Sequence, residues 1–183
     1  MADVGKLKEE DSVLIVIDVQ EKFKLVIHGW DGTLVNIVKL VRGCQILDIP
    51  VIVTEQYPKG LGRTVQEIRD ALDFNPVEKM SFSCFGEEGF KRKLEGFGRK
   101  TLVLCGVEAH VCLLNTTLDA LEKGYKVHYV VDAVSSRNPT DKEIAVKRVI
   151  HAGAYPTSTE MILFQLLEKA GTEEFKEISK IVK

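Results

Sequence analysis

Short apolar runs alternate with amphipathic stretches along the whole chain, and no other feature constrains the fold as strongly. The apolar runs are rich in Val, Ile and Leu and predict strands at 13–19, 51–54, 77–80, 101–105, 127–131 and 154–157. Apolar residues at helical spacing predict helices at 33–47, 65–72, 87–95, 110–123, 141–151, 158–169 and 172–183. Strands and helices that alternate in this way build a mostly parallel sheet with helices on both faces. We therefore predict a Rossmann-like α/β fold with three αβα layers, in which a doubly wound six-stranded sheet has the order 3-2-1-4-5-6.

The composition fits a single domain that spans residues 1–183. With 183 residues, of which 45% are hydrophobic, the chain is long enough for one substantial core and short for two. A formal net charge of −2 provides no basic field that would attract nucleic acid. No apolar run reaches membrane-spanning length, and the polar first residues are unlike a signal peptide, so we expect a cytoplasmic protein without nucleic-acid or membrane partners. The four cysteines lack close pairing, which favours reduced thiols over disulfides.

Cys112 is the candidate nucleophile. The apolar run 101–105 stops at Gly106, and a helical pattern then continues as far as Gly124, which fits a C-terminal cap. Cys112 is expected in the first turn of that helix, where unpaired N–H groups and the helix dipole favour a thiolate. The plainer interpretation is that Cys112, like most buried cysteines, is a small hydrophobic core residue.

Two charged residues stand at the ends of other predicted strands. Asp18 follows strand one, at the carboxyl edge where open α/β sheets bind ligands, although a turn former or helix cap is the simpler role. Lys79 ends strand three, although a single lysine is usually a solvated surface charge. Strands one and four are neighbours in the predicted order, so Asp18 and Cys112 face one another and Lys79 leans across the same edge. A dinucleotide-binding oxidoreductase uses the same type of sheet, but the turn after strand one contains no glycine.

The sequence around these three residues resembles the isochorismatase-like cysteine hydrolase family. The resemblance rests on Val-Ile-Asp-Val-Gln around Asp18, on Lys-Met-Ser-Phe-Ser from Lys79 and on Cys-Gly-Val-Glu-Ala-His-Val-Cys up to Cys112. It continues through 53–62, 130–137 and 157–161, which look closest to the isochorismatase domain-containing proteins. The resemblance implies a triad in which Cys112 attacks, Asp18 carries the proton and Lys79 fixes the carboxylate. It also implies a non-proline cis peptide between Val107 and Glu108, in the turn whose N–H groups are the natural oxyanion donors.

Departures from the family pattern bear on the substrate. The nicotinamidase branch holds a divalent metal through an Asp and two His after strand two, whereas residues 54–60 here read Thr-Glu-Gln-Tyr-Pro-Lys-Gly. The four histidines are scattered, so we expect no metal site and no cofactor. True isochorismatases lack a cysteine at the position of Cys112, so its presence favours cleavage of a small amide or related C–N bond through a thioester. Four aromatic side chains are expected in the substrate pocket, although each is more often core packing: Phe23, Trp30, Tyr57 and Phe82.

Two other functions and one mode of assembly remain open. Members of a family can be catalytically silent and serve as binding or assembly modules even when they keep the triad residues. A redox-active or peroxide-sensing thiol at Cys112 is the third function, although no Cys-x-x-Cys motif supports it. The helix at 157–167 is apolar around much of its circumference, which predicts a homo-oligomer; the alternative is that this helix lies deep in a monomer core.

Overall fold

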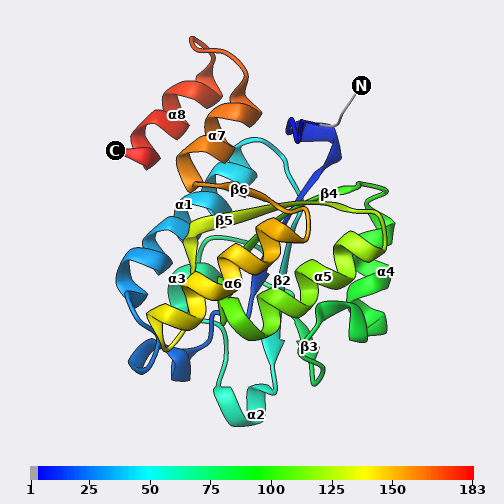
Figure 1. Ribbon diagram of the computed structural model, residues 1–183. Coiled ribbons are helices and arrows are strands. Elements are labelled where there is room, and N and C mark those ends of the chain that lie inside the picture. Colours follow the sequence, from blue (N-terminus) through cyan, green and yellow to red (C-terminus); the bar gives the residue numbers. More distant parts are fainter. Residues whose placement is uncertain (1–3) are drawn as a thin grey trace.

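One six-stranded sheet organises the fold (Figure 1). The computed structural model describes residues 4–183. The strands are β1 (Ser12–Ile17), β2 (Val51–Gln56), β3 (Val77–Lys79), β4 (Thr101–Val107), β5 (Lys126–Ser135) and β6 (Tyr155–Thr157). Each neighbouring pair is parallel, and the order is β3-β2-β1-β4-β5-β6. The predicted doubly wound order is therefore confirmed.

Helices cover both faces of this sheet, as Figure 1 shows. They are α1 (Trp30–Ile46), α2 (Pro58–Leu61), α3 (Gln66–Arg69), α4 (Glu88–Gly96), α5 (Leu114–Glu122), α6 (Pro139–His151), α7 (Thr159–Leu167) and α8 (Glu173–Val182). Shorter turns are η1 (Glu9–Asp11), η2 (Glu21–Leu25), η3 (Cys84–Gly86) and the π-helical η4 (Ala109–Leu113). The helix predicted at 65–72 forms only one turn, α3, whose single buried residue is Ile68. In residues 4–183, no helix is both long and apolar enough to cross a bilayer.

Strand side chains divide between two cores, because successive residues of a strand point to opposite faces. On β1, Leu14 and Val16 belong to the core that α1, α3, α7 and α8 cover. Val13, Ile15 and Ile17 belong to the other core, under α4, α5 and α6. Every residue of β1 is buried, which explains why its apolar run is unbroken rather than alternating.

Gly106 allows β4 to lie close against β1 at the carboxyl edge of the sheet. Its φ is +122°, and a Cβ atom on this residue would stand 2.1 Å from the carbonyl oxygen of Ile17. Only glycine accepts both the backbone conformation and this approach. Ile17 is in register with Gly106 on one side and Thr54 on the other, so β1, β2 and β4 end at the same edge.

Packing within the chain explains much of the apolar circumference of α7. Ile162, Leu163, Leu166 and Leu167 are buried in the core shared with α1 and α8, whereas Met161 is exposed. The helix packs on both sides within its own chain, which accounts for most of its apolar surface. The buried alternative therefore accounts for most of this helix, while Met161 and Phe164 stay exposed, and a homo-oligomer that uses them stays a prediction.

Candidate active site

The ends of β1, β3 and β4 place Asp18, Lys79 and Cys112 at one edge of the sheet. Asp18 directly follows β1, Lys79 is the last residue of β3, and Cys112 lies in η4, after β4. The Nζ atom of Lys79 is 2.8 Å from Oδ2 of Asp18, and neither side chain has exposed surface. The thiol of Cys112 interacts electrostatically with both groups and lies 3.9 Å from Gln56 Oε1. The structure therefore gathers the three predicted residues in one buried cluster.

Thr54 and the backbone of β2 hold Asp18 in position. The Asp18 N–H donates to the Thr54 carbonyl oxygen at 3.2 Å, and Thr54 Oγ1 donates to Oδ1 of Asp18 at 2.7 Å. Asp18 has a φ of 55°, which turns the chain at the end of β1. With Oδ1 bonded to Thr54, the other carboxylate oxygen, Oδ2, faces Lys79 and is the atom placed to accept a proton.

Lys79 has acceptors around its whole ammonium group. Besides Asp18, its Nζ donates to Gln56 Oε1 at 2.6 Å and to the carbonyl oxygens of Ser81 and Phe82 at 3.2 and 3.3 Å. Burial alone would lower the pKa of Lys79, but the negative charge of Asp18 and the two nearby thiols outweigh it and raise that pKa overall. Lys79 therefore remains a fixed positive charge beside the thiol.

Gln56 is a site residue that the sequence analysis treated only as part of a loop without metal ligands. Its Nε2 donates to the Met80 carbonyl oxygen at 2.9 Å, so Oε1 turns toward Lys79 and lies 3.9 Å from Cys112 Sγ. Gln20 is fully buried and fixes the Gln56 backbone, accepting from its N–H at 2.8 Å and donating to its carbonyl oxygen at 3.0 Å. Gln56 ends β2, so the strand-end rule applied to Asp18 and Lys79 also points to it.

The electrostatic surroundings of Cys112 differ from the prediction. Burial raises the pKa of its thiol, Asp18 raises it further, and the opposing effect of Lys79 is smaller. The residue lies in the π-helical turn η4, and α5 begins two residues later, at Leu114. Cys112 therefore lies in the first helical turn after β4, as predicted, but burial and the neighbouring carboxylate oppose the thiolate that a helix start favours, so a resting thiolate stays a prediction.

A second thiol, Cys84, lies beside the same charged pair. Its side chain is fully buried, its N–H donates to Thr116 Oγ1 at 3.0 Å, and burial is the main cause that raises its pKa to about 12. Asp18 adds to this rise, and Lys79 opposes it. All four cysteines are free and buried. The structure places Cys84 in the core beneath the site.

The turn between β4 and Cys112 is held at both ends. The peptide bond between Val107 and Glu108 is cis, the conformation that the family resemblance implies. The Glu108 carboxylate accepts hydrogen bonds from the N–H and the Nε of Arg137, both at 3.0 Å. The Glu108 carbonyl oxygen accepts from the N–H groups of Val111 and Leu113. These contacts fix the backbone that leads into Cys112.

The four aromatic residues expected at the pocket lie in two different environments. Phe23 and Trp30 pack in the core on the α1 side, which does not contain Cys112. Tyr57 and Phe82 are exposed, and their backbones contact Lys79: the Tyr57 N–H donates to its carbonyl oxygen, and the Phe82 carbonyl oxygen accepts from Nζ. That any of the four contacts substrate stays a prediction.

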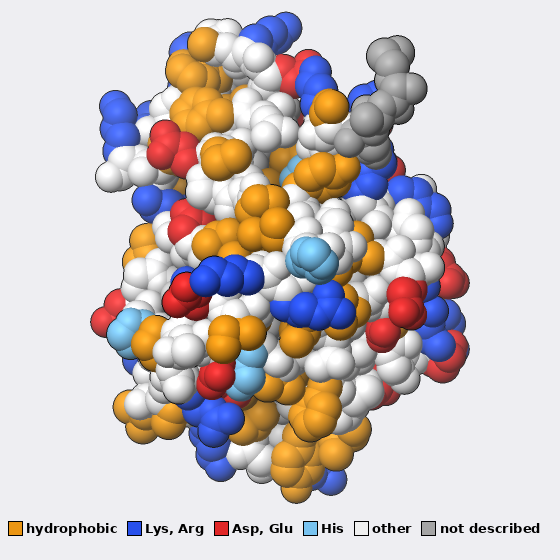
Figure 2. Space-filling model, in the orientation of Figure 1, with side chains coloured by type: hydrophobic (Ala, Val, Ile, Leu, Met, Phe, Trp, Pro, Cys, Tyr) orange, Lys and Arg blue, Asp and Glu red, His pale blue; other side chains and the backbone are white. Residues whose placement is uncertain are grey.

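An apolar rim follows the ends of β1, β2 and β3. It consists of exposed large hydrophobic side chains on the loops after these strands: Leu25, Val26, Tyr57, Met80 and Phe82. Figure 2 shows hydrophobic side chains gathered over the lower edge of the molecule, where α2 and the end of β3 lie in Figure 1. Contiguous exposed apolar surface is a feature of binding sites.

The side chains that could ligate a metal do not gather at this edge. Among residues 4–183, no group of three or more His, Cys, Asp and Glu side chains is arranged to hold a metal ion. Glu55, the carboxylate in the loop where a metal-using relative places its ligands, accepts from the N–H and hydroxyl of Thr64 and pairs with Arg63 at 3.0 Å. Its oxygens are therefore already occupied.

Residues 12–161, most of the chain, match the isochorismatase domain. The chain therefore belongs to the isochorismatase family, and hydrolysis is the general activity that this membership supports. The α/β sheet and the buried cluster of Asp18, Lys79 and Cys112 at its carboxyl edge agree with that class.

Individual relatives cover nearly the whole chain. Isochorismatase domain-containing protein 2 of Danio rerio is 43% identical over 100% of this chain and 92% of its own length. The secreted isochorismatase effector Isc1 of Phytophthora sojae is 44% identical, over 98% of this chain and 88% of the effector. Among solved structures, the MAR1 ribonuclease of Caenorhabditis elegans is 40% identical with a TM-score of 0.91, over 97% of this chain and 92% of that one.

Proposed function

We propose that this chain is a metal-independent cysteine hydrolase that cleaves a small amide or related C–N bond with Asp18, Lys79 and Cys112. The observation that carries the proposal is the buried 2.8 Å contact between Lys79 and Asp18, with the Cys112 thiol beside both groups. A buried ion pair contributes little to stability, so its place beside a nucleophile favours a chemical role. The exposed apolar rim supports a substrate with some apolar surface.

In the first half of the reaction, a thioester forms. Oδ2 of Asp18 takes the thiol proton while Sγ of Cys112 attacks the carbonyl carbon, and the C–O electrons move onto the oxygen. N–H groups of the turn after Val107 donate to this oxyanion. The protonated Asp18 then gives its proton to the substrate nitrogen, the C–N bond breaks, and the amine leaves. Lys79 stays protonated and balances the negative charge throughout.

In the second half, water releases the acid. Asp18 takes a proton from a water molecule while the oxygen of that water attacks the thioester carbon. Asp18 then passes the proton to Sγ of Cys112, and the C–S bond breaks. The raised pKa of the Cys112 thiol gives Asp18 its function, because a thiol that stays protonated at neutral pH attacks only if a base removes its proton. The reaction needs no metal or other cofactor.

Ammonia release from a panel of small amides tests this function. Cys112→Ala should abolish turnover and leave the fold intact, and Cys112→Ser should lose nearly as much because a serine hydroxyl is far harder to deprotonate. The matched control is Cys44→Ala, which removes another buried thiol from the core on the opposite face of the sheet. Cys112→Ala that keeps most of the activity on a confirmed substrate would overturn the proposal.

RNA is the alternative substrate, because the Caenorhabditis elegans relative is named a ribonuclease. This chain has a formal net charge of −2, and Lys79, the cation beside the thiol, is buried and paired rather than free for phosphate. Labelled RNA incubated with the same variants separates the two functions. RNA cleavage that Cys112→Ala abolishes, in a preparation inert toward amides, would replace amide hydrolysis.

A catalytically silent member and a peroxide sensor are the remaining functions. A silent member would leave every amide intact and keep Cys112 unreactive toward small electrophiles at all pH values at which it stays folded. A sensor would form a sulfenate or disulfide at low peroxide doses. We also propose a cytoplasmic location; the Phytophthora sojae relative is named a secreted effector, so fractionation of cells and medium checks this point.

A further inference from the structure

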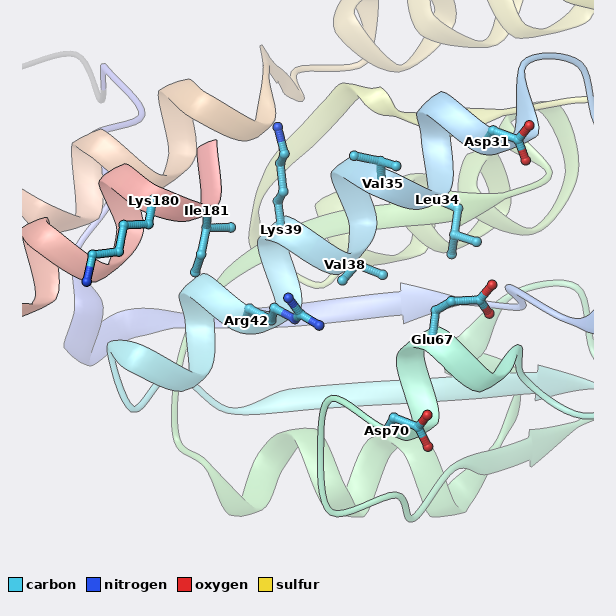
Figure 3. Close-up of a pocket in the computed structure, with 10 residues that line it drawn as sticks. All are labelled: Asp31, Leu34, Val35, Val38, Lys39, Arg42, Glu67, Asp70, Lys180 and Ile181. Carbon is cyan, nitrogen blue, oxygen red and sulfur yellow. The ribbon is translucent and has the colours of Figure 1, made fainter. Parts of the chain in front are cut away.

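A groove of about 870 Å³ runs along the outward face of α1, between α3 and α8 (Figure 3). Its middle is apolar and is formed by Leu34, Val35, Val38 and Ile181. Val35 is 52% exposed, so the apolar floor of the groove is open to a partner. The groove lies on the α1 face of the sheet and shares no residue with the catalytic cluster.

Charges of opposite sign occupy opposite ends of this groove. Figure 3 shows the acidic side chains of Asp31 and Glu67 toward one end and the basic side chains of Lys39, Arg42 and Lys180 toward the other, with a third acidic side chain, Asp70, between them at the end of α3. In the part of the chain that the structure describes, neither Asp31 nor Arg42 forms an ion pair, and both side chains are exposed. The groove therefore offers unpaired charges of both signs around an apolar middle.

The spacing of these residues on α1 is symmetric. Asp31, Val35, Val38 and Arg42 follow one another in steps of four, three and four residues, so they form one stripe on the helix. Asp31 and Arg42 lie equally far, along the helix, from the midpoint between Val35 and Val38. A two-fold axis through that midpoint places an identical antiparallel helix with its acidic end over the basic end of the first. The stripe is therefore complementary to itself.

We propose that this groove is an interface between two copies of the chain, in which α1 packs antiparallel against α1 of the second copy. Asp31 of each copy pairs with Arg42 of the other, and the valines of the two stripes cover one another. An isologous contact needs a self-complementary surface. This stripe is self-complementary in the spacing of its residues along the helix and in the placement of its charges. A partner of uniform charge would match only one end of the groove.

Charge reversal tests the pairing, with molecular mass measured by sedimentation velocity at micromolar concentration. Asp31→Arg alone sets two arginines against each other at both ends of the interface, and Arg42→Asp alone sets two aspartates together. Each single variant should weaken the dimer roughly tenfold or more. The double variant D31R/R42D exchanges the charges and should restore the dimer of the unmodified chain.

Mixing the two single variants gives the sharpest result. The mixture should form a heterodimer although neither variant dimerises alone, because opposite charges then meet at both ends of the interface. At one end the introduced arginine of the first variant faces the introduced aspartate of the second, and at the other end the original pair of Asp31 and Arg42 remains. The matched controls are Glu122→Arg on α5 and Arg92→Asp on α4, exposed charges on the other face of the sheet, which should change nothing. If the chain forms a larger assembly, the single variants should reduce it to the unit that lacks this contact.

Three results would overturn the interface. The unmodified chain could stay monomeric at high micromolar concentration. Both single variants could keep its mass. The mixture could remain monomeric while each variant stays folded by circular dichroism. The first result would show that copies do not associate, the second that they associate through another surface, and the third that Asp31 and Arg42 do not pair between copies.

Discussion

At the residue scale, the site is organised around the ammonium group of Lys79. Asp18 and Gln56 take its two shortest contacts, at 2.8 and 2.6 Å, and the backbone of residues 81 and 82 takes the longer ones. One of these partners is charged and the other is neutral. The two therefore act differently on the neighbouring thiol of Cys112, and substitutions at each should shift its pKa in predictable directions.

Asp18→Asn should lower the pKa of the Cys112 thiol while it removes activity. The carboxylate raises that pKa through its negative charge, so its loss moves the pH dependence of thiol alkylation to lower pH. Turnover should still fall by about 10²- to 10⁴-fold, because the base that accepts the thiol proton is gone. Alkylation of Cys112 followed by peptide mass spectrometry measures the first effect, and ammonia release measures the second.

The matched control for this prediction is Asp48→Asn, an exposed residue with positive φ at the end of α1, where asparagine is well tolerated. It should leave both measurements unchanged. An Asp18→Asn variant that loses turnover but keeps the alkylation profile of the unmodified chain would contradict the electrostatic account of the thiol.

Two substitutions of Gln56 should shift the pKa of the Cys112 thiol in opposite directions. Gln56→Glu adds a carboxylate beside Lys79 and Cys112 and should raise the pKa of the thiol by about one unit or more. Gln56→Met has similar length but offers Lys79 no good acceptor, so one N–H becomes free for sulfur and the pKa should fall. The pH profile of Cys112 alkylation separates these shifts from a general loss of structure, which would move both variants in the same direction.

The sequence predicts some of these residues better than others. Asp18, Lys79 and Cys112 could be found because the carboxyl ends of parallel strands meet at one edge, and the family motifs agree with that rule. The hydrogen bonds of Gln56 and Gln20 depend on side-chain contacts between strands, which periodicity does not report. The raised pKa of Cys112 depends on how deeply the turn is buried, and position in the chain gives no measure of that depth.

At the element scale, the contact between β1 and β4 depends on Gly106. Gly106→Ala should destabilise the fold by about 3 kcal/mol or more, from a strained positive φ and a Cβ atom 2.1 Å from the Ile17 carbonyl oxygen. Gly96→Ala, at the end of α4 with open space around the new methyl group, should stay within about 1 kcal/mol of the unmodified chain. Urea unfolding of the three proteins measures the difference, and equal midpoints would contradict the packing argument.

The sequence predicted which segments form helices and strands, but it did not predict the conformation of the first helical turn after β4. Leucines at helical spacing predict a helix over 110–123, and Gly124, with φ +78°, ends it as expected. The spacing does not distinguish an α-helical first turn from the π-helical turn that the structure has at 109–113. Likewise, one buried residue in α3 was too little to sustain the longer helix predicted there.

At the scale of the whole molecule, the strand order could be predicted because right-handed crossovers leave few ways to join alternating strands and helices. Assembly could not be predicted in the same way. The sequence pattern of an apolar helix is the same whether the helix packs against a partner subunit or against its own chain. In the structure, α7 packs against α1 and α8 of its own chain. The symmetric stripe on α1 becomes visible only when the structure shows which face of that helix is uncovered.

Activity should not depend on divalent metal ions. Glu55 is committed to Thr64 and Arg63, and no other carboxylate or histidine lies in the loop 54–60. Turnover of a confirmed amide should therefore survive prolonged treatment with chelators and should not rise on addition of zinc. A chelator that stops turnover, with recovery on addition of one stoichiometric divalent ion, would place the chain in a different branch of its family.

The central claim is that the reaction passes through a thioester on Cys112, and mass spectrometry of the acid-quenched enzyme tests it most directly. During turnover of a small amide, the chain should gain the mass of the acyl group, the modified peptide should contain Cys112, and hydroxylamine should remove the adduct. Cys112→Ala should show neither adduct nor turnover. An acyl adduct on any other residue, or continued turnover by Cys112→Ala, would contradict the mechanism.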